Sequence, residues 1–404
     1  MKDISFEEAI AETTGFSAKE AQVIVENQPI IHDFLQQSNI TKRDDFVDLV
    51  VRSKPYQIIL TFEKGVKVNE IISEVPQKLR RFIKVRKSKN TKAGRRDTTT
   101  ELTRAFSSIP SGYSVWYDAD AEIIRVDTDT EETASKLRPL VPKKLSDNIE
   151  FMVGFLPKKI SSTTAVPTNV IAGQWADAGH GVYTRGSTST LCTLGFGITF
   201  ENGLNGILTA GHCTEPKVAV SPNGYAFEDT YVEYTEGATN GNYDYAIYRT
   251  DGLYSEDYIY FNNHRQTGGF PSTGYFRTGS FIRQRYLWVG MYTCLSGAVS
   301  GLDCGEVWEV NYNNRGNAGT FTRLRNYYSS FAEAGDSGAP AFAELSTNKD
   351  GEVTAMGIMV GGDSAPYSWS GSPTGLVYQG VMQPIDRIFE HLDGKHNVRV
   401  KTTP

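Results

Sequence analysis

Glycine is distributed very unevenly along this 404-residue chain, and this limits the folds that its two halves can adopt. Residues 1–160 contain 5 glycines and 26 lysines and arginines, whereas residues 161–404 contain 33 glycines and 15 lysines and arginines. Glycine-rich segments form tight turns, because glycine adopts backbone conformations that other residues avoid. The break therefore predicts two domains, residues 1–155 and 175–404, joined by a linker over 156–174 that is rich in Ser, Thr and Pro.

The N-terminal half alternates helix-like and strand-like segments. A helix is expected from Ser17, which serves as N-cap with Glu20 three positions later. Further helices are predicted over 6–14, over 68–83 with a break at Pro76, and over 130–141; strands are predicted over 56–62, 113–118, 122–128 and 149–155. This order predicts a single α+β unit, a split-βαβ sandwich, and it contains no catalytic motif.

A basic run extends from Arg80 to Arg96 and contains nine lysines and arginines. It has two interpretations: a site for nucleic acid or another acidic partner, or a solvated helix end followed by an exposed loop. The second is favoured, because no series of aromatic residues alternates with the charges as single-strand binding would require. With a net charge of −6, no nucleic-acid partner is expected.

Neither a membrane span nor an export signal is visible in the sequence. No apolar run approaches the roughly 18 residues that a membrane-spanning helix needs, so no membrane partner is expected. The first residues, MKDISFEEAI, are acidic and polar, unlike a signal peptide.

The C-terminal half predicts an all-β fold. Short runs such as GFGITF, NGILTA and YDYAIYR are rich in β-branched and aromatic residues, and turns rich in Gly, Asn and Ser separate them. This pattern is typical of a barrel or a sandwich.

Three short motifs of this half carry residues that suit nucleophilic catalysis. His212 ends the strand-like NGILTAGHC, Asp244 opens NYDYAIY, and Ser337 lies in the tight GDSGAP. A serine hydroxyl becomes a nucleophile only beside a base, which an acid in turn orients. None of the six histidines has a metal-binding spacing, so we expect no metal and no cofactor.

Together these motifs resemble those of the chymotrypsin-like serine proteases, above all the bacterial branch of streptogrisins and α-lytic protease. The segments LCTLGFGITFENGLNGILTAGHC, GAVSGLDCGEV and AEAGDSG add to the likeness, which extends from about Gly179 to His391. The resemblance implies a double β-barrel catalytic domain that hydrolyses protein or peptide substrates. Because an N-terminal pro-region is typical of this branch, it also implies a zymogen in which the N-terminal domain is a partner of the barrel.

The resemblance assigns roles to individual residues. Ser337 would be the nucleophile, His212 the general base and Asp244 the residue that orients His212. The N–H groups of Gly335 and Ser337 would form the oxyanion hole. Asp336 would be buried and would orient the loop through a cation or backbone amides.

The substrate pocket is where the chain departs from the family. Its floor and wall would be formed by Phe331, Ala332, Glu333, Val360, Gly361 and Gly362. Phe331 replaces a common cysteine, and Val360 replaces the serine that usually supports the triad acid. No aspartate lies six residues before Ser337, so we expect cleavage after medium or large apolar residues.

The resemblance also pairs the four cysteines, Cys192 with Cys213 and Cys294 with Cys304. Disulfides imply an oxidising compartment, so a secreted, extracellular protein is expected. The alternative is four free thiols in a cytosolic protein. For function, the alternative to an active endopeptidase is an inactive relative that binds peptides or proteins, although all three triad residues are present.

Overall fold

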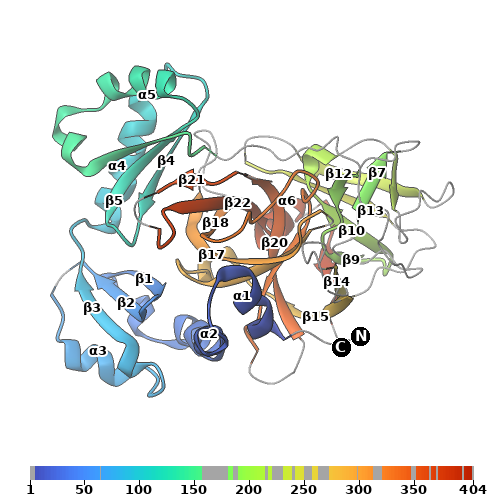
Figure 1. The fold of residues 1–404 in the computed structure, drawn as a ribbon, viewed down its shortest axis with the longest axis horizontal. Coiled ribbons are helices and arrows are strands. Elements are labelled where there is room, and N and C mark those ends of the chain that lie inside the picture. The colour runs from blue at the N-terminus through green and yellow to red at the C-terminus, as the bar shows by residue number, and fades with distance from the viewer. Residues whose placement is uncertain are drawn as a thin grey trace.

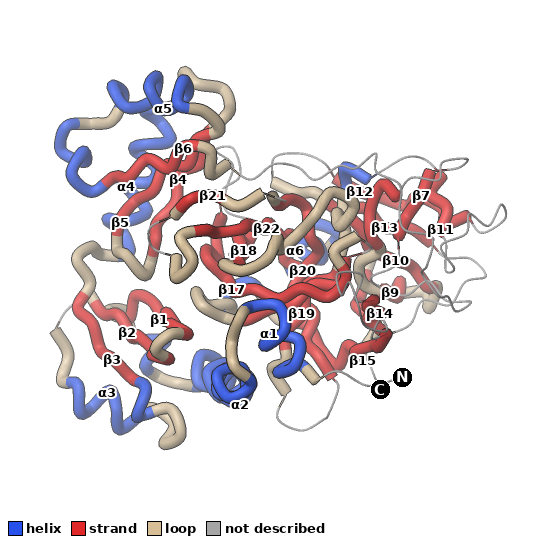
Figure 2. The backbone as a smooth tube through the Cα atoms, in the orientation of Figure 1, coloured by secondary structure: helices blue, strands red, loops and turns tan. Residues whose placement is uncertain are grey.

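The computed structural model describes residues 5–156, 181–184, 190–213, 217–220, 231–238, 242–249, 257–262, 273–312 and 321–402, except for 64, 298, 347–351, 364, 370–371 and 394. Figure 1 shows the N-terminal sheets at the left, a barrel in the centre and a second group of strands at the right. Most helices belong to the N-terminal part, as Figure 2 shows. Among the described residues, no helix is long and apolar enough to cross a membrane.

Two helices at the N-terminus, α1 (Phe6–Thr14) and α2 (Ala18–Gln37), both begin with a capping box. In the second, the predicted pair is confirmed: Ser17 N–H donates to Glu20 at 2.8 Å, and Glu20 N–H donates back to the Ser17 hydroxyl. Both helices pack on the C-terminal barrel and share its hydrophobic core. The Phe6 ring, for example, lies 6.4 Å from the ring of Phe276.

The rest of the N-terminal part forms two small sheets, so the prediction of a single sandwich is wrong. In each unit an antiparallel hairpin is followed by a helix and a third strand parallel to the second. The first unit consists of β1 (Phe46–Ser53), β2 (Tyr56–Phe62), α3 (Val68–Glu74) and β3 (Ile83–Lys87). The second consists of β4 (Tyr113–Asp118), β5 (Ile123–Thr128), α5 (Glu131–Leu137) and β6 (Ile149–Val153). The helix α4 (Lys92–Ala105) connects the two units. Pro76 disfavours helical backbone at Val75, which explains why α3 ends early and leaves room for β3.

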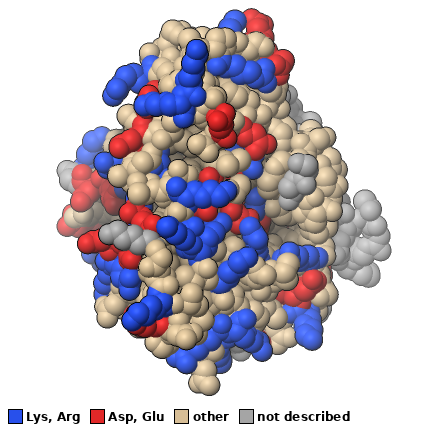
Figure 3. Space-filling view, turned by 90° about the vertical axis from the view of Figure 1, so that its left-hand side faces the viewer, with Lys and Arg blue, Asp and Glu red and all other residues tan. Residues whose placement is uncertain are grey.

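The basic run forms β3 and the start of α4, so its interpretation as a helix end followed by a loop is also wrong. Several of its charges are used internally: Arg86 donates to the carbonyls of Ala119 and Asp120, and Arg95 pairs with Asp48. On this side of the molecule, lysines and arginines are interspersed with acidic side chains (Figure 3). The surface therefore carries mixed charge rather than a single-sign patch.

The C-terminal part begins with an eight-stranded sheet in the order β23-β9-β10-β13-β12-β11-β7-β8. Its strands are β7 (Gly181–Thr184), β8 (Thr190–Thr193), β9 (Gly197–Phe200), β10 (Asn205–Thr209), β11 (Lys217–Val220), β12 (Tyr231–Ala238), β13 (Tyr245–Arg249) and β23 (Val398–Val400).

The second sheet has nine strands in the order β14-β15-β20-β19-β16-β17-β18-β22-β21, and an extra pairing of β20 with β22 closes six of them into a barrel. The strands are β14 (Tyr258–Asn262), β15 (Thr273–Phe281), β16 (Tyr292–Gly297), β17 (Gly301–Tyr312), β18 (Phe321–Asn326), β19 (Pro340–Ala343), β20 (Glu352–Gly362), β21 (Tyr367–Ser368) and β22 (Leu376–Pro384), followed by α6 (Ile385–Leu392). Short 3₁₀ turns occur at Ile40–Lys42, Arg80–Phe82, Arg138–Leu140, Lys143–Asn148, Gly211–Cys213 and Gln284–Tyr286. The predicted fold class, a β-barrel part preceded by an α+β part, is confirmed.

Candidate active site

The three motif residues meet where the two C-terminal sheets face each other. His212 follows β10, Asp244 precedes β13, and Ser337 precedes β19. The Nε2 atom of His212 lies 2.8 Å from the Ser337 hydroxyl, and its Nδ1 lies 2.9 Å from the Asp244 carboxylate. The arrangement therefore links a hydroxyl, an imidazole and a carboxylate in one hydrogen-bonded chain, the geometry that lets a base activate a serine.

Asp244 is held by the backbone and by a glutamine from the other sheet. Its second carboxylate oxygen accepts the His212 backbone N–H at 2.8 Å, and its own N–H donates to the amide oxygen of Gln383 at 3.0 Å. Gln383 is fully buried in β22. Val360 offers no hydroxyl to Asp244, but Gln383 holds the backbone of Asp244. No sequence motif indicated this role of Gln383.

The loop around Ser337 is shaped by two glycines and one buried acid. Gly335 and Gly338 have φ angles of +109° and +91°, which glycine tolerates best. Asp336 is fully buried and accepts backbone N–H groups from Glu333, Val299 and Ser300 at 2.8–3.1 Å. Burial raises the pKa of this carboxyl, while the three backbone amides oppose that rise. Backbone amides, one of the two expected partner types, therefore orient the loop.

Thr193 of β8 connects the loop to the first sheet. Its N–H donates to the Ser337 carbonyl at 2.7 Å, and its hydroxyl donates to the Gly335 carbonyl at 2.8 Å. The hydroxyl thereby holds the carbonyl of Gly335, whose N–H is one of the two proposed oxyanion-hole donors. No sequence motif indicated this residue.

We expect Thr193→Val to lower kcat about tenfold with little change in KM. The substitution keeps the shape of the side chain but leaves the buried Gly335 carbonyl without this donor, and an unsatisfied buried group costs about 1–3 kcal/mol. Steady-state peptide hydrolysis measures the effect, and Thr193→Ser, which keeps the hydroxyl, is the control. Equal losses in both variants would show that the hydrogen bond is not responsible.

The predicted pocket residues lie at the junction of β20, β22 and the loop before Ser337. Val360, Gly361 and Gly362 are buried at the end of β20, and Phe331 and Ala332 are fully buried nearby. The Phe331 ring fills a gap opposite Gly380, where an added Cβ would lie 2.6 Å from the ring. Glu333 is half-buried and accepts the Ser330 hydroxyl at 2.8 Å.

Both predicted disulfides are formed. Cys192 is bonded to Cys213 and Cys294 to Cys304, and none of the four cysteines is free. The alternative of four free thiols is therefore wrong. Among the described residues, the one group of potential metal ligands is Cys192, His212 and Cys213, and its two thiols are consumed by the disulfide.

Comparison with known proteins finds similarity to bacterial serine proteases. The chain is 26% identical over 187 residues to serine protease 2 of Streptomyces fradiae, a match that covers 46% of this chain and 92% of that protein. Among solved structures it is similar to Thermobifida fusca protease A (19% identity, 56% of this chain and 99% of the other, TM-score 0.38) and to Cellulomonas bogoriensis chymotrypsin (24% identity, 56% and 99%, TM-score 0.37). No family model matches the chain. The sequence match bears out the resemblance to bacterial chymotrypsin-like serine proteases and supports a serine protease function.

Proposed function

We propose that this chain, which resembles bacterial chymotrypsin-like serine proteases, is a serine endopeptidase made as a zymogen. The observation that carries the proposal is the hydrogen-bonded chain from Ser337 through His212 to Asp244. A structural role alone does not require a serine, a histidine and an aspartate from three distant segments to meet in this order.

The reaction follows from the geometry. The Ser337 hydroxyl attacks the carbonyl carbon of the scissile bond while His212 Nε2 takes its proton, and Asp244 stabilises the imidazolium that forms. The N–H groups of Gly335 and Ser337 would donate to the oxyanion of the tetrahedral intermediate. His212 then gives the proton to the leaving amine, which leaves an acyl-enzyme that water hydrolyses by the same route in reverse.

Labelling with a fluorophosphonate probe tests this proposal and its alternative, an inactive relative that binds peptides. The full chain is labelled before and after a cut in the segment 157–174, alongside the Ser337→Ala variant. An active enzyme is labelled at Ser337, and the variant is not. If neither the intact nor the cut chain reacts, the inactive alternative is correct.

We further propose that the enzyme is secreted and cleaves after apolar residues. Two disulfides suit an oxidising compartment. The buried, uncharged surroundings of Phe331, Ala332 and Val360 suit an apolar side chain of the substrate. A peptide library that shows a strict preference for Arg or Lys would contradict this specificity.

The N-terminal part would act as a pro-region that assists folding of the barrel. Its helices α1 and α2 share the hydrophobic core of the barrel, so a barrel made alone would expose that surface. Barrels of this kind also fold slowly, because strands far apart in sequence must pair. We therefore expect residues 161–404 to refold slowly alone and faster when residues 1–160 are added, with recovered peptidase activity as the readout. Rapid, complete recovery without the N-terminal part would contradict a folding role.

A further inference from the structure

A fully buried arginine joins the second N-terminal unit to the barrel. Arg323 of β18 pairs with Asp127 of β5, and the side chains of both residues are 0% exposed. The same guanidinium donates to the carbonyl of Phe155, just after β6, at 2.9 Å, and to the amide oxygen of Gln379 at 2.6 Å. One barrel side chain thus binds both a carboxylate and a main-chain carbonyl of the N-terminal part.

Aromatic rings enclose this arginine. Its guanidinium carbon lies 4.4 Å from the ring centre of Trp308, 5.1 Å from that of Trp116 and 5.3 Å from that of Tyr312. The Trp116 indole also donates to Asp127 at 2.9 Å. We call Trp116, Asp127, Trp308, Glu309, Tyr312 and Arg323 the Arg323 cluster. Two of its residues come from the N-terminal part and four from the barrel.

The cluster contains two carboxyl groups but one guanidinium. Glu309 of β17 is directly opposite Arg323 in the sheet and is also buried. Among the described residues, its Oε2 atom has no hydrogen-bond partner, and neither does Oδ1 of Asp127. A buried carboxylate without a partner costs far more than a buried protonated carboxyl. Because Asp127 makes the direct contact with Arg323, the spare proton belongs on Glu309.

The surroundings of Glu309 agree with this assignment. Burial raises the pKa of Glu309 well above its usual range; Arg323 opposes the rise, and the charges of Asp127 and Asp118 add to it. Of the other charged groups on the packed strands, Asp303 of β17 accepts hydrogen bonds from Asn326 and Ser329, and the rest form ion pairs.

These pairs are Arg125 of β5 with Asp118 of β4 and Glu150 of β6, and Arg325 of β18 with Glu306 of β17. No second cation among the described residues of these strands is therefore left to neutralise Glu309.

We propose that the face of β17, β18 and β22 that bears the Arg323 cluster is a proton-coupled docking surface for residues 113–155. Docking takes up one proton at Glu309, because separation of the two parts would expose this carboxyl to water and let it ionise. The sign follows from linkage: a group that binds its proton more tightly in the docked state favours docking at low pH. At pH values between the pKa of Glu309 in the separated state and its higher pKa in the docked state, the dissociation constant rises about tenfold per pH unit. Acid holds the N-terminal part on the barrel, and a rise in pH releases it.

The test uses the full chain with Ser337→Ala, so its outcome does not depend on catalysis. A site for a specific protease is inserted in the segment 161–174, and the folded chain is cut there. Competition with a fluorescently labelled copy of the N-terminal fragment then gives the dissociation constant and dissociation rate from pH 5 to pH 8. We expect weaker, faster-dissociating complexes as the pH rises, and Glu309→Gln, which mimics the protonated group, should remove this dependence.

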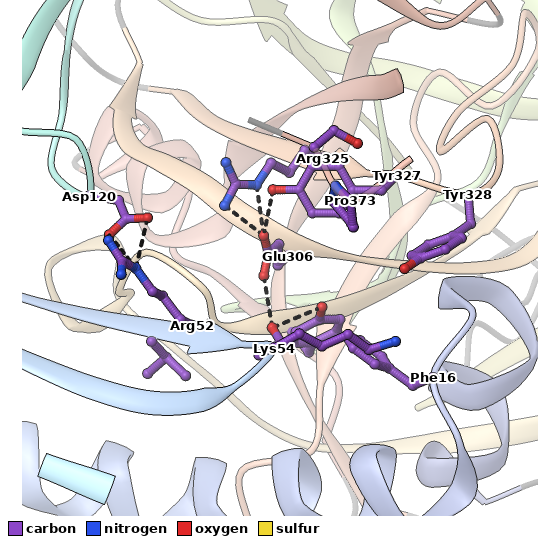
Figure 4. Close-up of a pocket in the computed structure, with 13 residues that line it drawn as sticks. Phe16, Arg52, Lys54, Asp120, Glu306, Arg325, Tyr327, Tyr328 and Pro373 are labelled. Atoms are coloured by element: carbon purple, nitrogen blue, oxygen red, sulfur yellow. Dashed lines mark hydrogen bonds and ion pairs between the residues drawn. The ribbon is translucent and has the colours of Figure 1, made fainter. Parts of the chain in front are cut away.

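Glu306→Gln is the matched control. Glu306 is buried on the same strand and borders a cavity of about 430 Å³ between the two parts of the chain, but it accepts Arg325 at 2.7 Å and also Tyr327, besides the Ser53 hydroxyl of the N-terminal part at 3.2 Å (Figure 4). Its charge is compensated within the barrel, so this variant should change the affinity equally at every pH. The proposal is wrong if docking does not weaken with pH, or if Glu309→Gln keeps the dependence of the parent chain.

Discussion

Each of the substitutions Ser337→Ala, His212→Ala and Asp244→Asn is expected to lower kcat for peptide hydrolysis by roughly 10⁴-fold or more. The first removes the proposed nucleophile and the second removes the proposed base, which lies 2.8 Å from it. The third keeps the shape of the acid but replaces the acceptor that fixes the tautomer of His212. Because the three residues act as one unit, the losses should be far from additive.

The measurement compares single, double and triple variants on one peptide substrate. The triple variant should be about as slow as Ser337→Ala alone. Asp386→Asn is a suitable control, because this buried carboxyl accepts the Gln284 N–H at 3.0 Å and is not part of the hydrogen-bonded chain from Ser337 to Asp244. Near-normal turnover in any one triad variant would overturn the assignment of that residue.

Arg323→Met is expected to lower the free energy of unfolding strongly. Removing one partner of a buried ion pair costs about 3–5 kcal/mol, because the other charge stays buried without compensation. Here Asp127 would keep its contact with Trp116 but lose its cation. Urea unfolding of the Ser337→Ala chain, followed by tryptophan fluorescence, measures the loss through the transition that separates the N-terminal part.

Arg277→Met is the comparison. Arg277 is 45% exposed and lies 3.9 Å from Asp257, so its loss should cost at most about 1 kcal/mol. Similar small effects of the two substitutions would show that the buried pair does not hold the two parts together.

The sequence was most informative where the chemistry is local. His212, Asp244 and Ser337 each lie in a short characteristic string, so each could be recognised without knowing what lies across the fold. The residues that hold the site in place could not be recognised in the sequence, because they carry no local signal. Gln383 and Thr193 resemble ordinary strand residues, and only the folded chain brings them to Asp244 and Gly335.

The N-terminal half was harder to predict, because its strands are short and its helices are interrupted. Residues 46–53 and 83–87 carry polar and charged positions that hid two strands, and the interpretation of the basic run as a helix end and a loop covered the second. The Arg323 cluster could not have been predicted at all. Asp127 and Arg323 are 196 residues apart, and neither stands out in its own strand.

The position of α1 has a consequence for the order in which this protein is made. Phe6 packs against Phe276 and Phe342, so the first helix finds its partners in the barrel only after about 270 to 340 further residues have been synthesised. At ~5–20 residues per second, the ribosome needs roughly 15–70 s to supply them. During that interval α1 can pack on α2 but not on the barrel, so the apolar side chains that later contact the barrel make the emerging N-terminus a ready client for a chaperone or an export factor.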